Sequence, residues 1–281
     1  MPCALLFPDR VSEGLEPVKH FGDALISTRD LDPLYCGLVH VGLPQPQWAR
    51  FVLAYLMFYH VGVASYLSEL DGVGFWRGVA GAAENIRSPG DVDNDLPEGR
   101  WPRGTERRHF RGPRCVLAVQ RLAEMFPRPQ DAVEGLLLAS DVLQLIQQVK
   151  QWPMFGPWVA FKAADIIGRT LPDPGRKRFR MGTDLVLMYD SPRAALNLVA
   201  STGAIQEVWY ELLTHFETYP APPWLERGCG PEEVETVLCK YGSMKTGHYY
   251  VGKDIAEQRH HLHGWGVTAA KLLSCYPGLV T

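Results

Sequence analysis

Arginine is concentrated in one short segment of this chain, residues 100–114. Six arginines and His109 lie there with a single acid, Glu106, although the formal net charge of the protein is only −3. A guanidinium group presents a rigid fork of N–H donors that matches phosphate and carboxylate oxygens. The segment is therefore typical of an oxyanion site, a nucleic-acid contact or a carboxylate network. The alternative is a solvated basic helix face, but Trp101 and Gly104 interrupt the run.

A second feature is a tight turn before a helix, at Phe155, Gly156 and Pro157. Its spacing resembles the hairpin of helix-hairpin-helix DNA-binding proteins, in which backbone N–H groups at a helix N-terminus hold a phosphate. Met154 stands where that hairpin has a second glycine, and Pro157 removes a donor. An ordinary connection between two helices is the alternative. Basic residues of the following loop, Arg176, Lys177 and Arg178, are further candidates for DNA contacts.

The segment from Gly247 to Lys253 matches the spacing G-x-x-x-x-G-K of a phosphate-binding loop. Asp254 occupies the place of the required Ser or Thr, and no buried strand precedes the loop, so a P-loop is excluded. What remains is a basic and aromatic loop able to hold an anion, with the candidates Lys245, His248, Tyr249 and Lys253.

Other polar residues have both a chemical and a structural interpretation. His260, His261 and His263 suggest a metal site, but two adjacent histidines cannot share one helical face, so a surface cluster is favoured and no metal site is predicted. Aspartates that follow the turn are candidate catalytic carboxylates or, alternatively, helix caps and salt-bridge partners: Asp165, Asp184 and Asp190.

Composition places the chain among ordinary globular proteins. Of its 281 residues, 46% are hydrophobic and 21% are charged, and its pI is about 6.3, which argues against a protein that coats nucleic acid indiscriminately. Six scattered cysteines without a C-x-x-C pair indicate a reducing cytoplasm.

Apolar residues recur at helical spacing through most of the chain, so we expect a mainly α fold. The stretch 51–67 is too short and too polar to cross a membrane, which takes about 20 apolar residues, and predicts one buried helix. Further helices are expected at 75–85, 115–125, 130–149, 154–167, 192–200 and 204–216, and from 231 onward. They form one catalytic domain over 1–281, or two lobes, about 1–150 and 151–281, with the active site between them.

Several motifs together resemble one family. They are Phe58-Tyr59-His60, Phe75-Trp76, Trp101 to Phe110, Phe155 to Trp158, Leu238-Cys239, Gly247-His248-Tyr249 and Gly252-Lys253-Asp254. The chain resembles, from about residue 30 to 275, the amino acid:DNA transferases of bacteriophages with hypermodified thymine, also called α-glutamyl/putrescinyl thymine pyrophosphorylases. The arginine segment and the Gly-His-Tyr loop are the most specific part.

The resemblance implies a fold related to helix-hairpin-helix DNA glycosylases. The implied substrate is double-stranded phage DNA in which a partner kinase has pyrophosphorylated 5-hydroxymethyluracil, and a free amino acid or polyamine then displaces pyrophosphate. It implies no membrane partner and a place in the cytoplasm of the infected host. It identifies no cofactor, and leaves open whether a divalent metal ion assists pyrophosphate departure.

Such a reaction needs cations at the leaving group, a base for the amine and a grip on DNA. The candidate clamp is Arg103, Arg107, Arg108 and Arg111, and the candidate bases are Glu106, His109 and Asp165. An amino-acid carboxylate would pair within the group Lys245, His248, Tyr249, Lys253 and Arg259. Trp101 is a candidate to stack on a flipped base. The candidate DNA contacts are Phe155, Gly156, Trp158, Lys162, Arg176, Lys177 and Arg178.

Two other functions remain open from the sequence. A helix-hairpin-helix DNA glycosylase would excise a modified base and leave abasic sites, whereas a transferase leaves the glycosidic bond whole. A non-catalytic DNA-binding module would bind unmodified duplex in a salt-dependent way, and the near-neutral charge counts against it.

Overall fold

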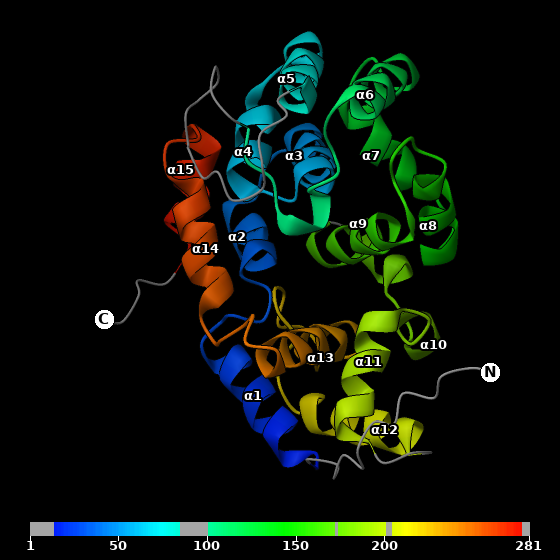
Figure 1. Cartoon of the computed structure of the whole chain (residues 1–281), viewed down its shortest axis with the longest axis vertical. Coiled ribbons are helices and arrows are strands. Elements are labelled where there is room, and N and C mark those ends of the chain that lie inside the picture. Colours follow the sequence, from blue (N-terminus) through cyan, green and yellow to red (C-terminus); the bar gives the residue numbers. More distant parts are fainter. Residues whose placement is uncertain (1–13, 85–100, 172–173, 201–203, 277–281) are drawn as a thin grey trace, which may run out of the picture. The chain divides into compact units, whose positions relative to one another are not determined.

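A computed structural model describes residues 14–84, 101–171, 174–200 and 204–276 (Figure 1). Over these ranges the regular structure is helical, and the β pairing is confined to an isolated bridge between Pro220 and Gly228. The mainly α fold expected from the sequence is confirmed. Arg100, at the start of the arginine segment, lies outside the described residues.

The chain forms two compact units, each assembled from segments distant in sequence. The first comprises Met1–Asp32 and Gly182–Lys253. Its central helix α13 packs against α1 and α11 (Figure 1). Its helices are α1 (Glu16–Ser27), α10 (Thr183–Val186), α11 (Asp190–Val199), α12 (Ile205–Phe216) and α13 (Pro231–Lys245).

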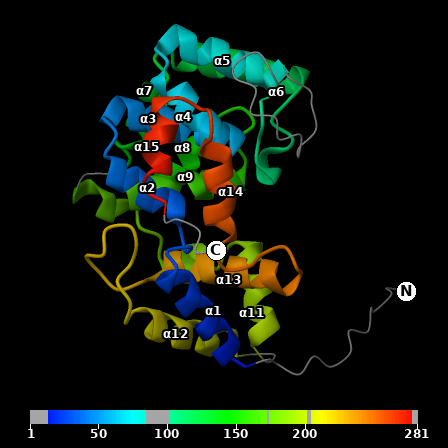
Figure 2. The same ribbon diagram turned by 90° about the vertical axis from the view of Figure 1, so that its left-hand side faces the viewer.

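The second unit comprises Pro33–Met181 and Asp254–Thr281. Its helices are α2 (Pro33–Val41), α3 (Gln45–Phe58), α4 (Val61–Glu69), α5 (Gly72–Glu84), η1 (Thr105–Arg107), α6 (Pro113–Met125), α7 (Gln130–Leu136), α8 (Val142–Lys150), α9 (Pro157–Thr170), η2 (Pro174–Phe179), α14 (Lys253–Leu262) and α15 (Val267–Leu273). Helix α14 begins at the last residue of the first unit. Figure 2 shows α5 beside α6, with which it packs.

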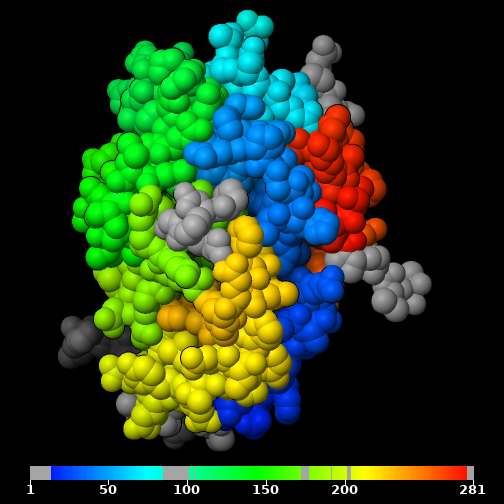
Figure 3. Space-filling model, turned by 180° about the vertical axis from the view of Figure 1, so that it is seen from behind, coloured from blue at the N-terminus to red at the C-terminus, as the bar shows by residue number. Residues whose placement is uncertain are grey.

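Helix α3 is the core of the second unit, and all its residues from Phe51 to Phe58 are buried. It packs on α4, α7 and α9, and Figure 3 shows the blue surface of α2 and α3 adjoining the green surface of α7 and α8. The single helix predicted across 51–67 is wrong, because Tyr59 adopts the left-handed conformation (φ 50°, ψ 40°). His60 then caps α4, its Nδ1 accepting from Val63 N at 3.2 Å.

A second predicted helix, 130–149, is also divided in two. The carboxylate of Asp141 accepts from the backbone N–H of Gln144 at 2.9 Å and so begins α8 as a new helix. Helices at the other predicted positions are present with shifted ends. Within the described residues, no helix is long and apolar enough to cross a membrane.

Helix α4 approaches α14 so closely that Gly62 leaves no room for a side chain. A Cβ at that position would lie 2.1 Å from the backbone oxygen of His261 and 2.5 Å from Cδ1 of Trp265. The absence of a Cβ therefore fixes the distance between these two helices.

We predict that Gly62→Ala lowers the free energy of unfolding by about 1–3 kcal/mol, since the backbone of α14 must shift. Gly81→Ala in α5 is the matched control, because a Cβ there meets nothing within 4 Å and alanine favours a helix over glycine by up to about 1 kcal/mol. Urea unfolding measures both, and equal stability of the two variants would contradict this packing.

Candidate active site

The arginine segment is docked on the C-terminus of α3. The backbone N–H of Gly104 donates to the oxygen of Phe58 at 2.8 Å. A Cβ at Gly104 would lie 2.6 Å from the oxygen of Tyr59, so only glycine allows this approach. The contact places η1 beside the left-handed residue that ends α3.

Arg103 is buried and its guanidinium donates to backbone oxygens. It bonds Ala82 O at 2.9 Å, in the last turn of α5, and also Phe110 O. The last carbonyls of a helix have no partner within it. Arg103 thus supplies a hydrogen-bond donor to a carbonyl at the end of α5 and connects the arginine segment to that helix.

Arg107 does the same for the end of α3. Its Nε donates to Met57 O at 3.0 Å and its Nη1 to Met154 O at 3.2 Å. The guanidinium also lies 4.6 Å from the ring centre of Phe110 and 5.3 Å from that of Phe155. Burial lowers the pKa of Arg107 to about 10, as it does that of Arg103, so both stay charged at neutral pH.

The four arginines of the predicted clamp therefore differ in position. Arg103 and Arg107 are buried on backbone carbonyls, whereas Arg108 is exposed and Arg111 half-buried. Glu106 and His109 are exposed on the same segment. Two guanidiniums thus hold the segment, and the residues left at its surface are those able to meet a ligand.

Glu106 and the side chains that are coupled to it electrostatically form a group that we call the acidic–aromatic cluster: Tyr55, Tyr59, Glu106, Asp254 and Glu257. Although Glu106 is exposed as a residue, desolvation by the surrounding protein raises the pKa of its carboxyl group. The charges of Asp254 and Glu257 raise it further, and Lys162 lowers it. The cluster joins α3, η1 and α14.

The two tyrosines of the cluster are held tightly. The centres of their rings lie 4.8 Å apart, with the ring planes tilted by 31°. Trp158, in the first turn of α9, meets Tyr59 edge-on at 5.1 Å. Burial raises the pKa of both tyrosines well above the usual value, and the nearby Glu106 and Asp254 add to the effect. Both are neutral phenols at working pH.

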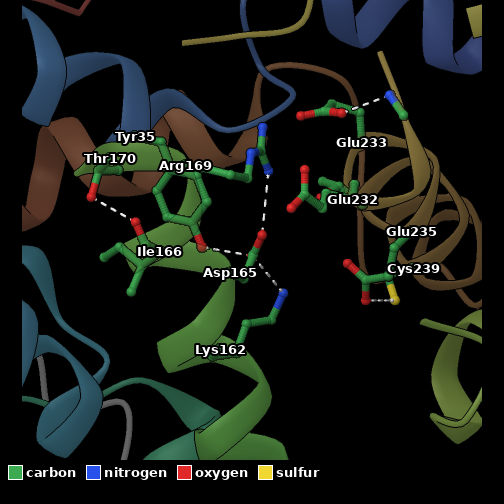
Figure 4. Close-up of polar contacts among 12 residues, drawn as sticks. Tyr35, Lys162, Asp165, Ile166, Arg169, Thr170, Glu232, Glu233, Glu235 and Cys239 are labelled. Atoms are coloured by element: carbon green, nitrogen blue, oxygen red, sulfur yellow. Dashed lines mark hydrogen bonds and ion pairs between the residues drawn. The ribbon is translucent and has the colours of Figure 1, made fainter. Parts of the chain in front are cut away.

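A buried network lies on α9 next to the cluster (Figure 4, left). Asp165 accepts from the hydroxyl of Tyr35 at 2.8 Å, and Lys162 Nζ lies 3.5 Å and Arg169 Nη1 3.7 Å from its carboxylate. Asp165 is only 1% exposed, yet its charge affects Tyr59. Lys162 therefore stands between the Asp165 network and the cluster.

The turn predicted before α9 joins α8 to α9. Met154 adopts a left-handed backbone, with φ 67°, at the place where a helix-hairpin-helix hairpin has a glycine. Gly156 is the extended N-cap of α9 and is exposed, and Phe155 is buried under Arg107. This conformation is compatible with a hairpin that faces a ligand.

The other predicted DNA and base contacts have varied surroundings. Lys177 and Arg178 are exposed on η2, and Arg178 donates to Leu137 O, whereas the side chain of Arg176 lies outside the described residues. Trp101 is buried against Tyr66 and Trp265, with ring centres 5.7 and 6.0 Å away. Trp158, by contrast, is half-buried.

The histidine group divides between surface and interior. The ring of His261 packs against that of the buried His60, tilted by 33° with ring centres 4.2 Å apart, and His260 and His263 are exposed. Over the part of the chain that the structure describes, no group of three or more His, Cys, Asp or Glu could hold a metal ion.

The loop Gly247–Lys253 of the first unit is organised around a buried acid. Asp30 accepts from the hydroxyl of Tyr249 and the N–H of Gly252, both at 2.6 Å. Lys253 Nζ donates to His248 O at 2.6 Å. Several donors of this predicted anion site thus have partners within the loop. Lys245 and His248 are exposed, and Arg259, in the second unit, donates to Tyr276 O at 3.2 Å.

The first unit also holds buried carboxylates on α13 (Figure 4, right). Arg227 forms 2.8 Å ion pairs with Glu232 and Glu233. Cys239 Sγ donates to Glu235 at 3.0 Å. Glu233 also accepts from the N–H of Gly230 at 2.8 Å, which closes the start of α13.

Sequence reasoning missed most of the acidic–aromatic cluster. Asp254 was considered as the residue that excludes a P-loop, and Tyr59 and Asp254 as members of motifs that carry the family resemblance, but none of Tyr55, Tyr59, Asp254 and Glu257 was predicted as a site residue. One signal was available. Asp254 and Glu257 are three residues apart and share one face of a helix, which places two carboxylates at the same site.

The arginine segment thus presents a carboxylate, Glu106, and the exposed Arg108 on one anchored loop of a helical protein. No protein-family model matches the chain. It is 34% identical over 275 residues to the glycinyltransferase of Pseudomonas phage PaMx11, covering 88% of this chain and 90% of that protein. It is 28% identical over 277 residues to the putrescinyltransferase of Delftia phage PhiW-14, covering 93% and 83%.

The chain is a transferase and belongs to the phage family of amino acid and polyamine:DNA transferases. The resemblance inferred from the sequence is confirmed.

Arg107→Lys should lower the free energy of unfolding by about 2–4 kcal/mol, because a lysine cannot bond the oxygens of Met57 and Met154 together and leaves buried polar groups unpaired. Arg108→Lys on the exposed side should change it by less than about 0.5 kcal/mol. Urea denaturation compares them, and an unchanged midpoint for Arg107→Lys would remove its anchoring role.

The free energy of unfolding should also fall on acidification because of the pair His60 and His261. Burial lowers the pKa of His261 to about 4 and that of His60 well below the usual 6.5. Between pH 6.5 and 4 the unfolded chain binds more protons, so this stability is complete above about pH 6.5 and is lost on acidification. Between pH 7 and pH 5, His261→Gln should lose less unfolding free energy than the wild type, by on the order of 1 kcal/mol. Exposed His263→Gln should lose as much as the wild type. Urea unfolding at pH 7 and pH 5 tests this. The same change of unfolding free energy between the two pH values in wild type and His261→Gln would refute it.

Proposed function

We propose that this protein transfers an amine to a thymine-derived base in DNA by displacing pyrophosphate from 5-pyrophosphoryloxymethyluracil. The observation that carries the proposal is that the Glu106 carboxylate and the exposed Arg108 lie on the same anchored segment. A displacement of this kind needs a base and a cation at opposite ends of the reacting bonds. The phage relatives named glycinyl- and putrescinyltransferase support an amine as the incoming group.

In the proposed step, a C–N bond forms between the amine and the 5-methylene carbon while the C–O bond to pyrophosphate breaks. Glu106 accepts the proton that the nitrogen loses. Its pKa lies above the ordinary value, which makes it a better proton acceptor than a solvated carboxylate. His109, exposed on the same segment, and Asp165 are the other candidate bases. Burial of Asp165 beneath Tyr35 favours Glu106.

The leaving pyrophosphate requires cations, since negative charge grows on its bridging oxygen. Because Arg103 and Arg107 hold backbone carbonyls, the proposed clamp rests on Arg108 and Arg111, and the buried pair positions them. In this proposal Arg108 and Arg111 supply positive charge to the leaving group, whether or not a metal ion assists.

The α8–α9 turn, with Lys177 and Arg178, is the proposed contact with the DNA backbone, and Arg176 is kept as a candidate. A base in a duplex must be flipped out to reach the cluster, and Trp158 beside Tyr59 is the proposed stacking partner. The proposed partners are phage DNA with modified thymine, a free amine and the kinase that pyrophosphorylates 5-hydroxymethyluracil. The reaction would take place in the host cytoplasm, where that DNA is made.

The test uses duplex DNA that carries pyrophosphorylated 5-hydroxymethyluracil, incubated with the protein and either glycine or 1,4-diaminobutane. Digestion and mass spectrometry should show a new nucleoside with a C–N bond at the 5-methylene carbon, and pyrophosphate should be released. Absence of a new nucleoside with both amines contradicts the proposal. Abasic sites in its place would indicate base excision instead.

Glu106→Gln should lower the transfer rate at least about 100-fold, since general-base catalysis contributes about 10²–10⁴-fold. Glu124 is exposed on α6, so Glu124→Gln is the control and should keep the wild-type rate. The wild-type rate should fall on acidification through the raised pKa of Glu106. A rate for Glu106→Gln near wild type would assign the base elsewhere.

A further inference from the structure

We infer that Tyr250 is a DNA-contacting residue whose ring stacks on a nucleobase, and that the loop 246–252 between α13 and α14 presents it for this contact (Figure 1). The inference rests on the proposed function, because it takes DNA as the partner. Neither the motifs of this loop nor the proposed transfer step gave Tyr250 a role.

The first argument is the exposure of the ring. Tyr250 is 61% exposed. Within the ranges of the chain that the structure describes, its side chain makes no hydrogen bond and no ring contact. A large aromatic surface left in water gains free energy when a partner covers it, so the ring is open to a ligand.

The second argument is that one buried carboxylate holds the loop on both sides of this ring. Asp30 is fully buried and accepts from the hydroxyl of Tyr249 and from the N–H of Gly252, both at 2.6 Å. The backbone oxygen of Tyr250 accepts from the N–H of Lys253 at 3.1 Å. The backbone that carries the ring is therefore already ordered, and it loses little conformational entropy on binding.

The two adjacent tyrosines of the loop have different surroundings. The ring of Tyr249 meets that of Phe21 edge-on at 6.2 Å between centres, and Lys240 Nζ lies 5.0 Å from the centre of the Tyr249 ring. Tyr249 thus anchors the loop to its own unit, whereas Tyr250 is presented to solvent.

The third argument is the charge around the exposed ring. From Met244 to Lys253 the chain has two lysines and a histidine and no acid. Lys245 and His248 are exposed, and Nδ1 of His248 lies 3.0 Å from Oγ1 of Thr246, which orients the imidazole. Basic side chains beside an exposed aromatic ring are typical of surfaces that bind single-stranded nucleic acid, where cations follow the phosphates and the ring stacks on a base.

Stacking of this kind suits a reaction on a flipped base. Extruding a nucleotide from a duplex costs the stacking energy of the bases that it leaves. A tyrosine that covers an unstacked base offsets part of that cost. Since every base has a π-face, the contact tolerates any sequence. We therefore expect Tyr250 to contribute to affinity for DNA whose bases are unpaired.

The test measures binding of the whole protein to a fluorescein-labelled single-stranded oligonucleotide of unmodified DNA by fluorescence anisotropy. Tyr250→Ala should weaken binding at least about fivefold, since stacking of one base on an aromatic ring contributes about five- to 150-fold. Tyr250→Phe keeps a ring and should bind like the wild type. Tyr210→Ala on α12 is the matched control, because Tyr210 is 60% exposed, and it should also bind like the wild type. Thermal melting verifies that each variant is folded.

The salt dependence of binding separates stacking from charge. The slope of the logarithm of affinity against the logarithm of salt concentration reports the number of phosphates that the protein neutralises. Tyr250→Ala should therefore keep the wild-type slope while its affinity falls.

Three results would overturn the inference: the wild type does not bind the strand, Tyr250→Ala binds it like the wild type, or its loss of affinity comes with a shallower salt slope. A change from dimer to monomer in Tyr250→Ala, seen by sedimentation, would assign the surface to a second copy of the chain instead.

The DNA in this test is unmodified, and no amine or pyrophosphate takes part. A failure here is therefore distinct from a failure of transfer in the nucleoside assay. Ring-dependent binding without any new nucleoside would keep Tyr250 as a DNA contact and reject the pyrophosphate reaction.

Discussion

Two buried guanidiniums determine the geometry on which the proposed chemistry depends. Arg107 donates to the last turn of α3 through Met57 and to the α8–α9 turn through Met154, and Arg103 donates to the last turn of α5 through Ala82. Helix ends leave carbonyls that need donors, and a planar guanidinium reaches two of them at once. The segment between these arginines is therefore held at both ends.

This anchoring explains how an exposed loop can hold the carboxylate that we propose as the base. Glu106 lies directly before Arg107, so fixing that guanidinium also fixes the position of Glu106 beside Gly104 and the carbonyl of Tyr59. The approach of Gly104 to the carbonyl of Tyr59 adds a second constraint from the other side. Precision at the site thus comes from the ends of helices, although its residues lie on a short 3₁₀ turn.

Much of the fold could be predicted from hydrophobic spacing, including the helical class and the helices at 75–85, 115–125 and 204–216. The break after Phe58 could not, since it depends on one residue in a left-handed conformation that apolar periodicity does not register. The two-lobe division near residue 150 and the helix-hairpin-helix relation stay predictions.

Part of the candidate site was also accessible from the sequence. The excess of arginine and the isolated Glu106 identified the segment, but no local signal tells which guanidiniums turn inward. Their partners are carbonyls of Met57, Ala82 and Met154, which only the tertiary fold brings near. The same holds for Tyr59 and Asp254, which are far apart in sequence although the charge of Asp254 raises the pKa of Tyr59.

The most direct test of the central claim is a crystal structure of the protein with bound pyrophosphate. We predict that pyrophosphate lies within hydrogen-bond distance of Arg108 and Arg111, on the same segment as Glu106, while Arg103 and Arg107 keep their bonds to backbone carbonyls. Pyrophosphate bound away from this segment, or held by Arg103 and Arg107 after they release those carbonyls, would contradict the account.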